Sequence, residues 1–154
     1  MKKIFLALFI GLMMIQISGC SKSEEAPAYY GTWEVMAAEP SPASDPSIIC
    51  ALSQDEISAL LGTRLFYSED SFRFNEEERT ITGYDSENVA YTCETFEEDY
   101  HLNLGEWWNE KNQVMFFEIS SEDDFFGRQF FVADEETIWI PYEGAVFLAK
   151  RAPF

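Results

Sequence analysis

The sequence has few basic residues. Of its 154 residues, 10 are Lys or Arg and 28 are Asp or Glu, so the formal net charge is −18 at pH 7. Nucleic-acid binding requires a positive surface that replaces the counterions on phosphate, and electrostatic adhesion to anionic lipid requires one as well. The composition therefore excludes nucleic acid and an anionic lipid surface as electrostatic partners.

The chain also lacks the motifs that usually carry catalysis or hold a cofactor. It contains no Gly-rich phosphate loop, no HExxH sequence and no CxxC sequence. His101, the only histidine, could act as a general base, but the spacing pairs no Ser or Cys nucleophile with it. We therefore interpret His101 as a polar surface residue and predict a protein that is not an enzyme, with no cofactor and no metal ion. An enzyme with an unrecognised site is a third hypothesis, which a loss of hydrolysis on replacing His101 would support.

The first twenty residues have the features of an export signal. A basic start is followed by apolar residues 4–15, and the small residues Ser18 and Gly19 stand directly before Cys20. The apolar run is too short for a membrane-spanning helix, which takes about 20 apolar residues. The pattern therefore predicts a cleaved secretory signal.

The end of this segment resembles the lipobox of bacterial lipoproteins. The resemblance implies that Cys20 carries the lipid anchor, that residues 1–19 are removed, and that residues 20–28 tether a single domain, residues 29–154, close to its membrane. It further implies an extracytoplasmic place in the cell envelope, with the outer membrane favoured in a Gram-negative source because Ser21, not Asp, follows Cys20. The alternative is an ordinary signal peptide followed by a disulfide cysteine.

Two further cysteines, Cys50 and Cys93, follow Cys20. Outside the cytoplasm an even pair predicts a disulfide. The alternatives are two free thiols or a metal pair, but a lone pair without nearby His or further Cys makes a poor zinc site. We therefore predict a disulfide between Cys50 and Cys93.

The aromatic content indicates a folded domain in spite of the high charge. The chain has 14 Phe, 7 Tyr and 4 Trp, whereas disordered chains are poor in aromatic residues. Residues 53–56 form a capping box that opens a helix over 53–61, and residues 95–100 predict a single helical turn after a second box. Short apolar stretches predict strands at 31–36, 64–68, 71–75, 80–84, 88–93, 113–119, 125–133, 137–142 and 145–151. The pattern favours a mainly β fold, an antiparallel barrel of about 8–9 strands with one short helix, with a β-sandwich as the alternative.

Three of these features together resemble the lipocalin-like barrel: Gly31-x-Trp33 on the first strand, a β-meander, and Lys150-Arg151 on the last strand. The run from Leu60 to Phe74 is similar to small bacterial lipocalin-like lipoproteins. The resemblance implies that Trp33 plugs one barrel end while Arg151 stacks on it. It also places the early helix as a lid over one barrel mouth. The chain departs from the larger lipocalins because it has no long helix after the barrel.

Acidic runs and a tryptophan pair complete the candidate features. The runs at 76–78, 97–99, 122–124 and 134–136 fall mostly at predicted strand ends, and none has the spacing of a calcium loop, so we interpret them as solvated turns. Trp107 and Trp108 point to opposite faces if extended, so either one is exposed for a contact, or one packs in the core while the other caps the barrel end.

These observations leave two main functions. The first is a lipid-anchored module that binds a small apolar or amphipathic ligand inside the barrel. The alternative is an acidic interaction module that binds a cationic envelope protein, as an inhibitor would. The two differ in salt dependence, because salt weakens an electrostatic partner more than a buried apolar ligand.

Overall fold

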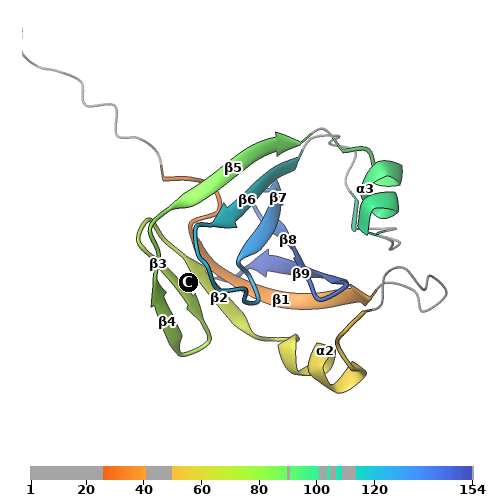
Figure 1. The fold of residues 1–154 in the computed structure, drawn as a ribbon, viewed down its shortest axis with the longest axis horizontal. Helices are drawn as coiled ribbons and strands as arrows, with labels where there is room; N and C mark the ends of the chain where they lie inside the picture. Colours follow the sequence, from red (N-terminus) through yellow and green to blue (C-terminus); the bar gives the residue numbers. More distant parts are fainter. Residues whose placement is uncertain are drawn as a thin grey trace, which may run out of the picture.

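A computed structural model describes residues 26–40, 50–89, 91–100, 104, 107–108 and 114–153. Within these residues nine strands form one antiparallel sheet that curls into a half-barrel, and two short helices lie outside it (Figure 1). The elements are β1 (Gly31–Pro40), α2 (Gln54–Leu60), β2 (Arg64–Tyr67), β3 (Ser71–Phe74), β4 (Glu77–Thr80), β5 (Tyr84–Val89), α3 (Cys93–Tyr100), β6 (Val114–Ile119), β7 (Gln129–Asp134), β8 (Thr137–Tyr142) and β9 (Ala145–Arg151). The mainly β, barrel-like prediction is confirmed.

The strand order explains the curl of the sheet. The order is β4-β3-β2-β1-β9-β8-β7-β6-β5, so the first strand pairs with both the second and the last. A register shift between Val35 and Ala37 interrupts the β1–β9 ladder, and Met36 at this bulge is 54% exposed. Bulges bend a strand and increase its twist. Strand β1 pairs with β2 from Gly31 to Glu34 and with β9 from Trp33 to Pro40.

The edge strands β4 and β5 do not pair with each other, but residues 81–83 join them directly in the chain. Ile81 donates its backbone N–H to the Asp70 carbonyl at 2.9 Å, and Ser120 donates to the Gly83 carbonyl at 3.1 Å. The Tyr84 hydroxyl donates to the Ser68 carbonyl at 2.8 Å. These bonds hold the two free edges near one corner, so the half-barrel is closed there by a connection and not by a ladder.

Helix α2 begins where the sequence predicts it. The Ser53 hydroxyl accepts from the Glu56 backbone N–H, and the Glu56 carboxylate accepts from the Ser53 backbone N–H at 2.8 Å, which completes the capping box. Ile57 is the buried residue of the helix and joins the core inside the half-barrel. Helix α2 therefore covers part of that core through Ile57.

Several predicted element boundaries were wrong. Helix α3 is a full eight-residue helix and not a single turn, and Thr92 caps it because its hydroxyl accepts from the Thr95 backbone N–H at 3.1 Å. The strand predicted at 88–93 lies at Tyr84–Val89 instead, and the strand predicted from 125 begins at Gln129 because Gly127 turns the chain with a φ of +87°.

Two hydrophobic clusters lie on opposite faces of the sheet. The inner cluster fills the half-barrel, and its buried members are Tyr29, Trp33, Val35, Ile57, Leu65, Tyr67, Phe72, Ile81, Ile119, Phe126, Phe130, Ile138, Ile140, Ala145, Phe147 and Ala149. The outer cluster lies under α3, and its buried members are Phe96, Leu104, Val114, Phe131, Ala133, Trp139 and Val146. Successive side chains of a strand point to opposite faces, so β7 and β8 supply both clusters.

Candidate functional site

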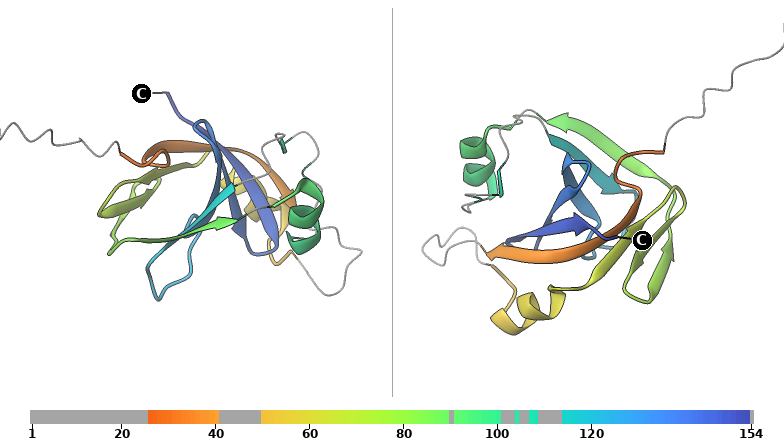
Figure 2. Two further views of the ribbon diagram at one scale, coloured as in Figure 1. Left: turned by 90° about the horizontal axis from the view of Figure 1, so that it is seen from above. Right: turned by 180° about the vertical axis from the view of Figure 1, so that it is seen from behind.

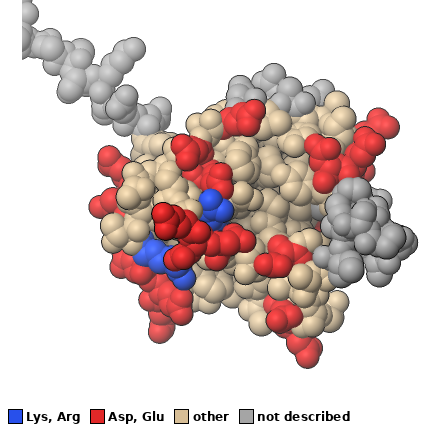
Figure 3. Space-filling model, in the orientation of Figure 1, with Lys and Arg blue, Asp and Glu red and all other residues tan. Residues whose placement is uncertain are grey.

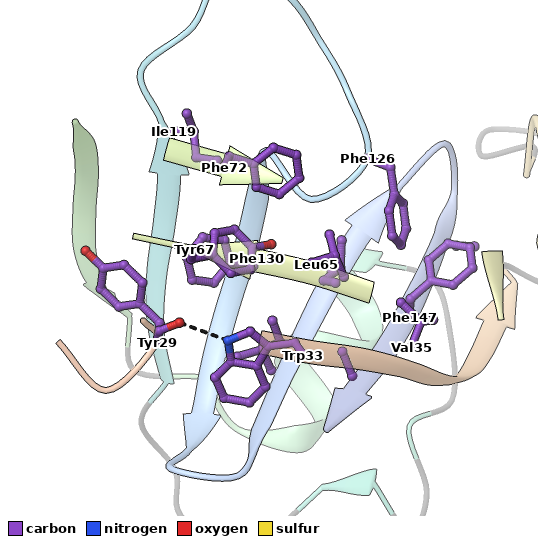
Figure 4. Packing of buried hydrophobic residues seen from close by; sticks show 14 of the residues in the cluster. Tyr29, Trp33, Val35, Leu65, Tyr67, Phe72, Ile119, Phe126, Phe130 and Phe147 are labelled. Atoms are coloured by element: carbon purple, nitrogen blue, oxygen red, sulfur yellow. Dashed lines mark hydrogen bonds between the residues drawn. The ribbon is translucent and has the colours of Figure 1, made fainter. Parts of the chain in front are cut away.

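The interior of the half-barrel is filled with aromatic side chains. Trp33, Tyr67, Phe130 and Phe147 are each 0% exposed. The Phe130 ring lies 4.5 Å from that of Tyr67 and 5.5 Å from that of Tyr29, centroid to centroid, and Figure 4 shows these rings packed above the Trp33 indole. Protein interiors are close-packed, and these contacts occupy the space in which an internal ligand would lie.

Burial also fixes the ionisation of the interior tyrosines. Loss of hydration raises the pKa of Tyr67 well above its usual value, and it raises the pKa of Tyr29 and of Tyr84 as well. The Tyr67 hydroxyl donates to the Gly127 carbonyl at 2.9 Å. The interior tyrosines therefore keep their protons to a higher pH than an exposed tyrosine would.

Trp33 and Arg151 face each other across the β1–β9 ladder, as the resemblance to lipocalin-like barrels implies. Their Cα atoms are register partners, and the Arg151 guanidinium carbon lies 4.4 Å from the centroid of the Trp33 ring. Arg151 also donates to the backbone carbonyls of Glu135, Tyr30 and Ala28. We call this set of contacts the Arg151 clasp.

The clasp fastens the segment that precedes β1. The Trp33 indole N–H donates to the Tyr29 carbonyl at 2.9 Å (Figure 4), and Tyr29 itself is 6% exposed within the inner cluster. Gly31 has a φ of +124°, and a Cβ at this position would lie 2.9 Å from the Arg151 guanidinium. The backbone conformation therefore favours glycine at this point, and a larger residue would also displace the Arg151 guanidinium.

The predicted disulfide is absent, and Cys50 and Cys93 are free thiols. Cys50 packs against the inner cluster and donates its thiol to the Leu52 carbonyl at 3.6 Å. Cys93 opens α3, on the opposite face of the sheet, where burial and then the Glu97 carboxylate raise the pKa of its thiol. The disulfide predicted from an even pair of cysteines does not form because Cys50 packs on the inner face of the sheet, whereas Cys93 opens α3 over the outer face.

The tryptophan pair belongs to the outer cluster. Trp107 and Trp108 are both half-buried against it, and Trp108 stacks on Trp139 with ring centroids 5.2 Å apart. Neither arrangement predicted from the sequence occurs, because both residues cover the outer face of the sheet. Cys20 and His101 lie outside the described residues.

Open pockets lie at the surface of the described residues. One groove of about 240 Å³ runs between the C-terminal end of α3, the β6–β7 loop and the β8–β9 turn. We name it the acidic groove, after its lining residues Asp99, Tyr100, Asp124, Phe125, Tyr142 and Glu143. Local sequence patterns do not predict this groove, because its lining residues come from three separate segments of the chain.

Neither a metal centre nor a membrane span is found within the described part of the chain. These residues contain no group of three or more His, Cys, Asp or Glu side chains that could hold a metal ion. No helix among them is long and apolar enough to cross a bilayer. Comparison of the chain with family models, with curated proteins and with solved structures gives no match.

Proposed function

We propose that this protein is a non-catalytic binding module whose strongly acidic surface binds a cationic protein. The observation that carries the proposal is an acidic exterior around a packed aromatic interior. Figure 3 shows acidic side chains in several patches across the visible face, with the few basic side chains in one part of it. With a net charge of −18, such a surface accelerates encounter with a positively charged partner and rejects acidic ones.

The interior gives less support to a small apolar ligand, the other candidate from the sequence. A drug-sized site is a concave pocket of about 300–1,000 Å³. In the half-barrel the corresponding space holds Trp33, Tyr67 and Phe130, each fully buried. A ligand of that size would have to displace these rings and their contacts.

The same proposal places the module at a membrane in the cell envelope. The support is the lipobox resemblance at Cys20 in the sequence. Two acyl chains on one cysteine would hold the protein firmly, since each buried CH₂ contributes about 0.8 kcal/mol. The test is metabolic labelling with a palmitate analogue in the native host, which should label the unaltered protein and leave a Cys20→Ala variant unlabelled. An unaltered protein without label, or equal labelling of the Cys20→Ala variant, would contradict the lipid anchor.

Calorimetry on the full-length chain, purified in mild detergent, tests the binding function. A peptide of ten lysines is the cationic probe, and a peptide of ten serines is the neutral control. We expect saturable binding of the lysine peptide at low salt, a large loss of affinity at high salt because the charges are screened, and no binding of the serine peptide. A bound small molecule in the native mass spectrum, together with no lysine-peptide binding, would refute the proposal in favour of an internal ligand.

A further inference from the structure

We propose that the acidic groove is where the cationic partner docks, and that a lysine or arginine side chain of that partner inserts between the groove's aromatic walls. This inference rests on the proposed function, because it locates the site of the same binding. The observations that carry it are the shape of the groove, its aromatic lining, its charge and its place in the fold.

The groove combines apolar walls with a negative rim. Tyr100, Phe125 and Tyr142 are partly buried and supply ring surface, whereas Asp99 and Glu143 are exposed. An aromatic face attracts a cation, and the long apolar stem of Lys or Arg packs along such surface while its charged head stays near the rim. A groove of about 240 Å³ accommodates one such side chain and is small for a whole apolar ligand.

One wall of the groove already contacts a cation of the chain itself. The Arg79 guanidinium lies 4.8 Å from the centroid of the Phe125 ring. Arg79 comes from β4, and its guanidinium lies 3.9 Å from the Asp123 carboxylate, beside the groove. Tyr142 and Glu143 line the same groove and offer an incoming side chain a ring and a carboxylate as well.

The charges around the groove are only partly neutralised. The Asp124 carboxylate is 73% exposed, and its ion pair with Arg128 is long at 4.0 Å because Arg128 contacts Glu118 at 2.7 Å. Tyr142 responds to these charges. Burial is the largest cause that raises its pKa, and the negative charges of Glu143, Asp124 and Glu56 raise it further. A cation that enters the groove would therefore meet a negative electrostatic potential that the basic residues of the chain only partly neutralise.

The groove lies far from the end that would be tethered. Strand β9 runs from Ala145 at the groove to Arg151 at the clasp, a span of roughly 20 Å at 3.3 Å per residue. Figures 1 and 2 show α3 on one side of the molecule and the first described residues on the other. A chain held at its N-terminus would therefore present the groove away from the membrane.

Two sets of charge-removing variants distinguish this groove from the acidic surface in general. The groove triple is Asp99→Asn with Asp124→Asn and Glu143→Gln. The control triple is Glu69→Gln with Glu76→Gln and Glu77→Gln, at exposed positions in the β2–β4 region. Each triple removes three negative charges, so both change the net charge equally. Thermal unfolding of each variant checks that it is folded.

The lysine-peptide affinity of the full-length chain in mild detergent is the readout. We expect the groove triple to weaken binding about tenfold, since each surface ion pair contributes up to about 1 kcal/mol, and the control triple to weaken it less than about threefold. Equal losses in the two triples would overturn the groove and leave the proposed function standing. No binding by the unaltered protein would overturn both.

Tyr142 supplies a second test that does not depend on charge removal. Tyr142→Leu removes the aromatic face but keeps an apolar side chain, and it should weaken lysine-peptide binding about threefold. Tyr142→Phe keeps the ring and should bind as the unaltered protein does. Equal affinities of the two variants would show that the ring does not contact the bound cation and would overturn the insertion.

Discussion

Replacing Arg151 with Met should destabilise the domain by about 3 kcal/mol. The change removes the guanidinium that lies 4.4 Å from the Trp33 ring centroid, a contact that contributes about 0.5–2 kcal/mol. It also removes the donors to the carbonyls of Glu135, Tyr30 and Ala28. Three hydrogen bonds of about 1 kcal/mol each bring the sum to about 3.5–5 kcal/mol. Two of the three bonds are exposed to solvent and contribute less, so we expect a loss of about 3 kcal/mol.

Urea unfolding, followed by tryptophan fluorescence, measures the effect. Arg151→Lys should fall between Met and the unaltered chain, because Lys keeps the charge but lacks the planar fork that reaches several carbonyls. Arg64→Met is the matched control, since Arg64 forms an exposed ion pair with Glu34 at 3.2 Å and such pairs contribute about 0–1 kcal/mol. An Arg151→Met variant as stable as the Arg64→Met variant would refute the reasoning.

Three further predictions follow from the core and the thiols. Gly127→Ala should lower the free energy of unfolding, measured in urea, by about 1–3 kcal/mol, because φ is +87° and the new Cβ would lie 2.4 Å from a methyl group of buried Leu65. An unchanged free energy of unfolding would show that the loop moves to accommodate the methyl group. The free energy of unfolding should fall as pH rises above 10.0, the ordinary tyrosine pKa. Burial raises the pKa of Tyr67 in the folded chain, so Tyr67 loses its proton in the unfolded chain first. Constant stability between pH 9 and about 11 would contradict this burial. Cys50 and Cys93 should both react with iodoacetamide without reductant, since they are free and only partly buried; the mass spectrum counts the labels, and labelling that requires reductant would show a disulfide.

Local signals in the sequence predicted the parts of this fold that depend on neighbouring residues. The capping box at Ser53 and Glu56 identified α2 because both partners lie within one helical turn. The start of α3 was missed because its box uses Thr at both ends, Thr92 and Thr95, in place of the usual Glu or Gln. Alternation also gave no signal for β5, an edge strand whose Asp85, Ser86 and Glu87 are all exposed.

Features that depend on the assembled sheet needed more than local patterns. The contact between Trp33 and Arg151 requires the register of the first and last strands, and only the family resemblance suggested it. The pairing of Cys50 with Cys93 failed because spacing contains no information about which face of the sheet an element covers. The acidic groove was not predicted, since a helix end, a loop and a turn build it.

The Arg151 clasp has a mechanical consequence for a chain held at its N-terminus. A pulling force would enter at residues 26–30 and reach Arg151 through the carbonyls of Ala28 and Tyr30 before it reached the β1 ladder. The load would therefore pass directly to β9, at the centre of the sheet. Rupture would then begin with the clasp, and β1 would retain its partners on both sides until the clasp had opened.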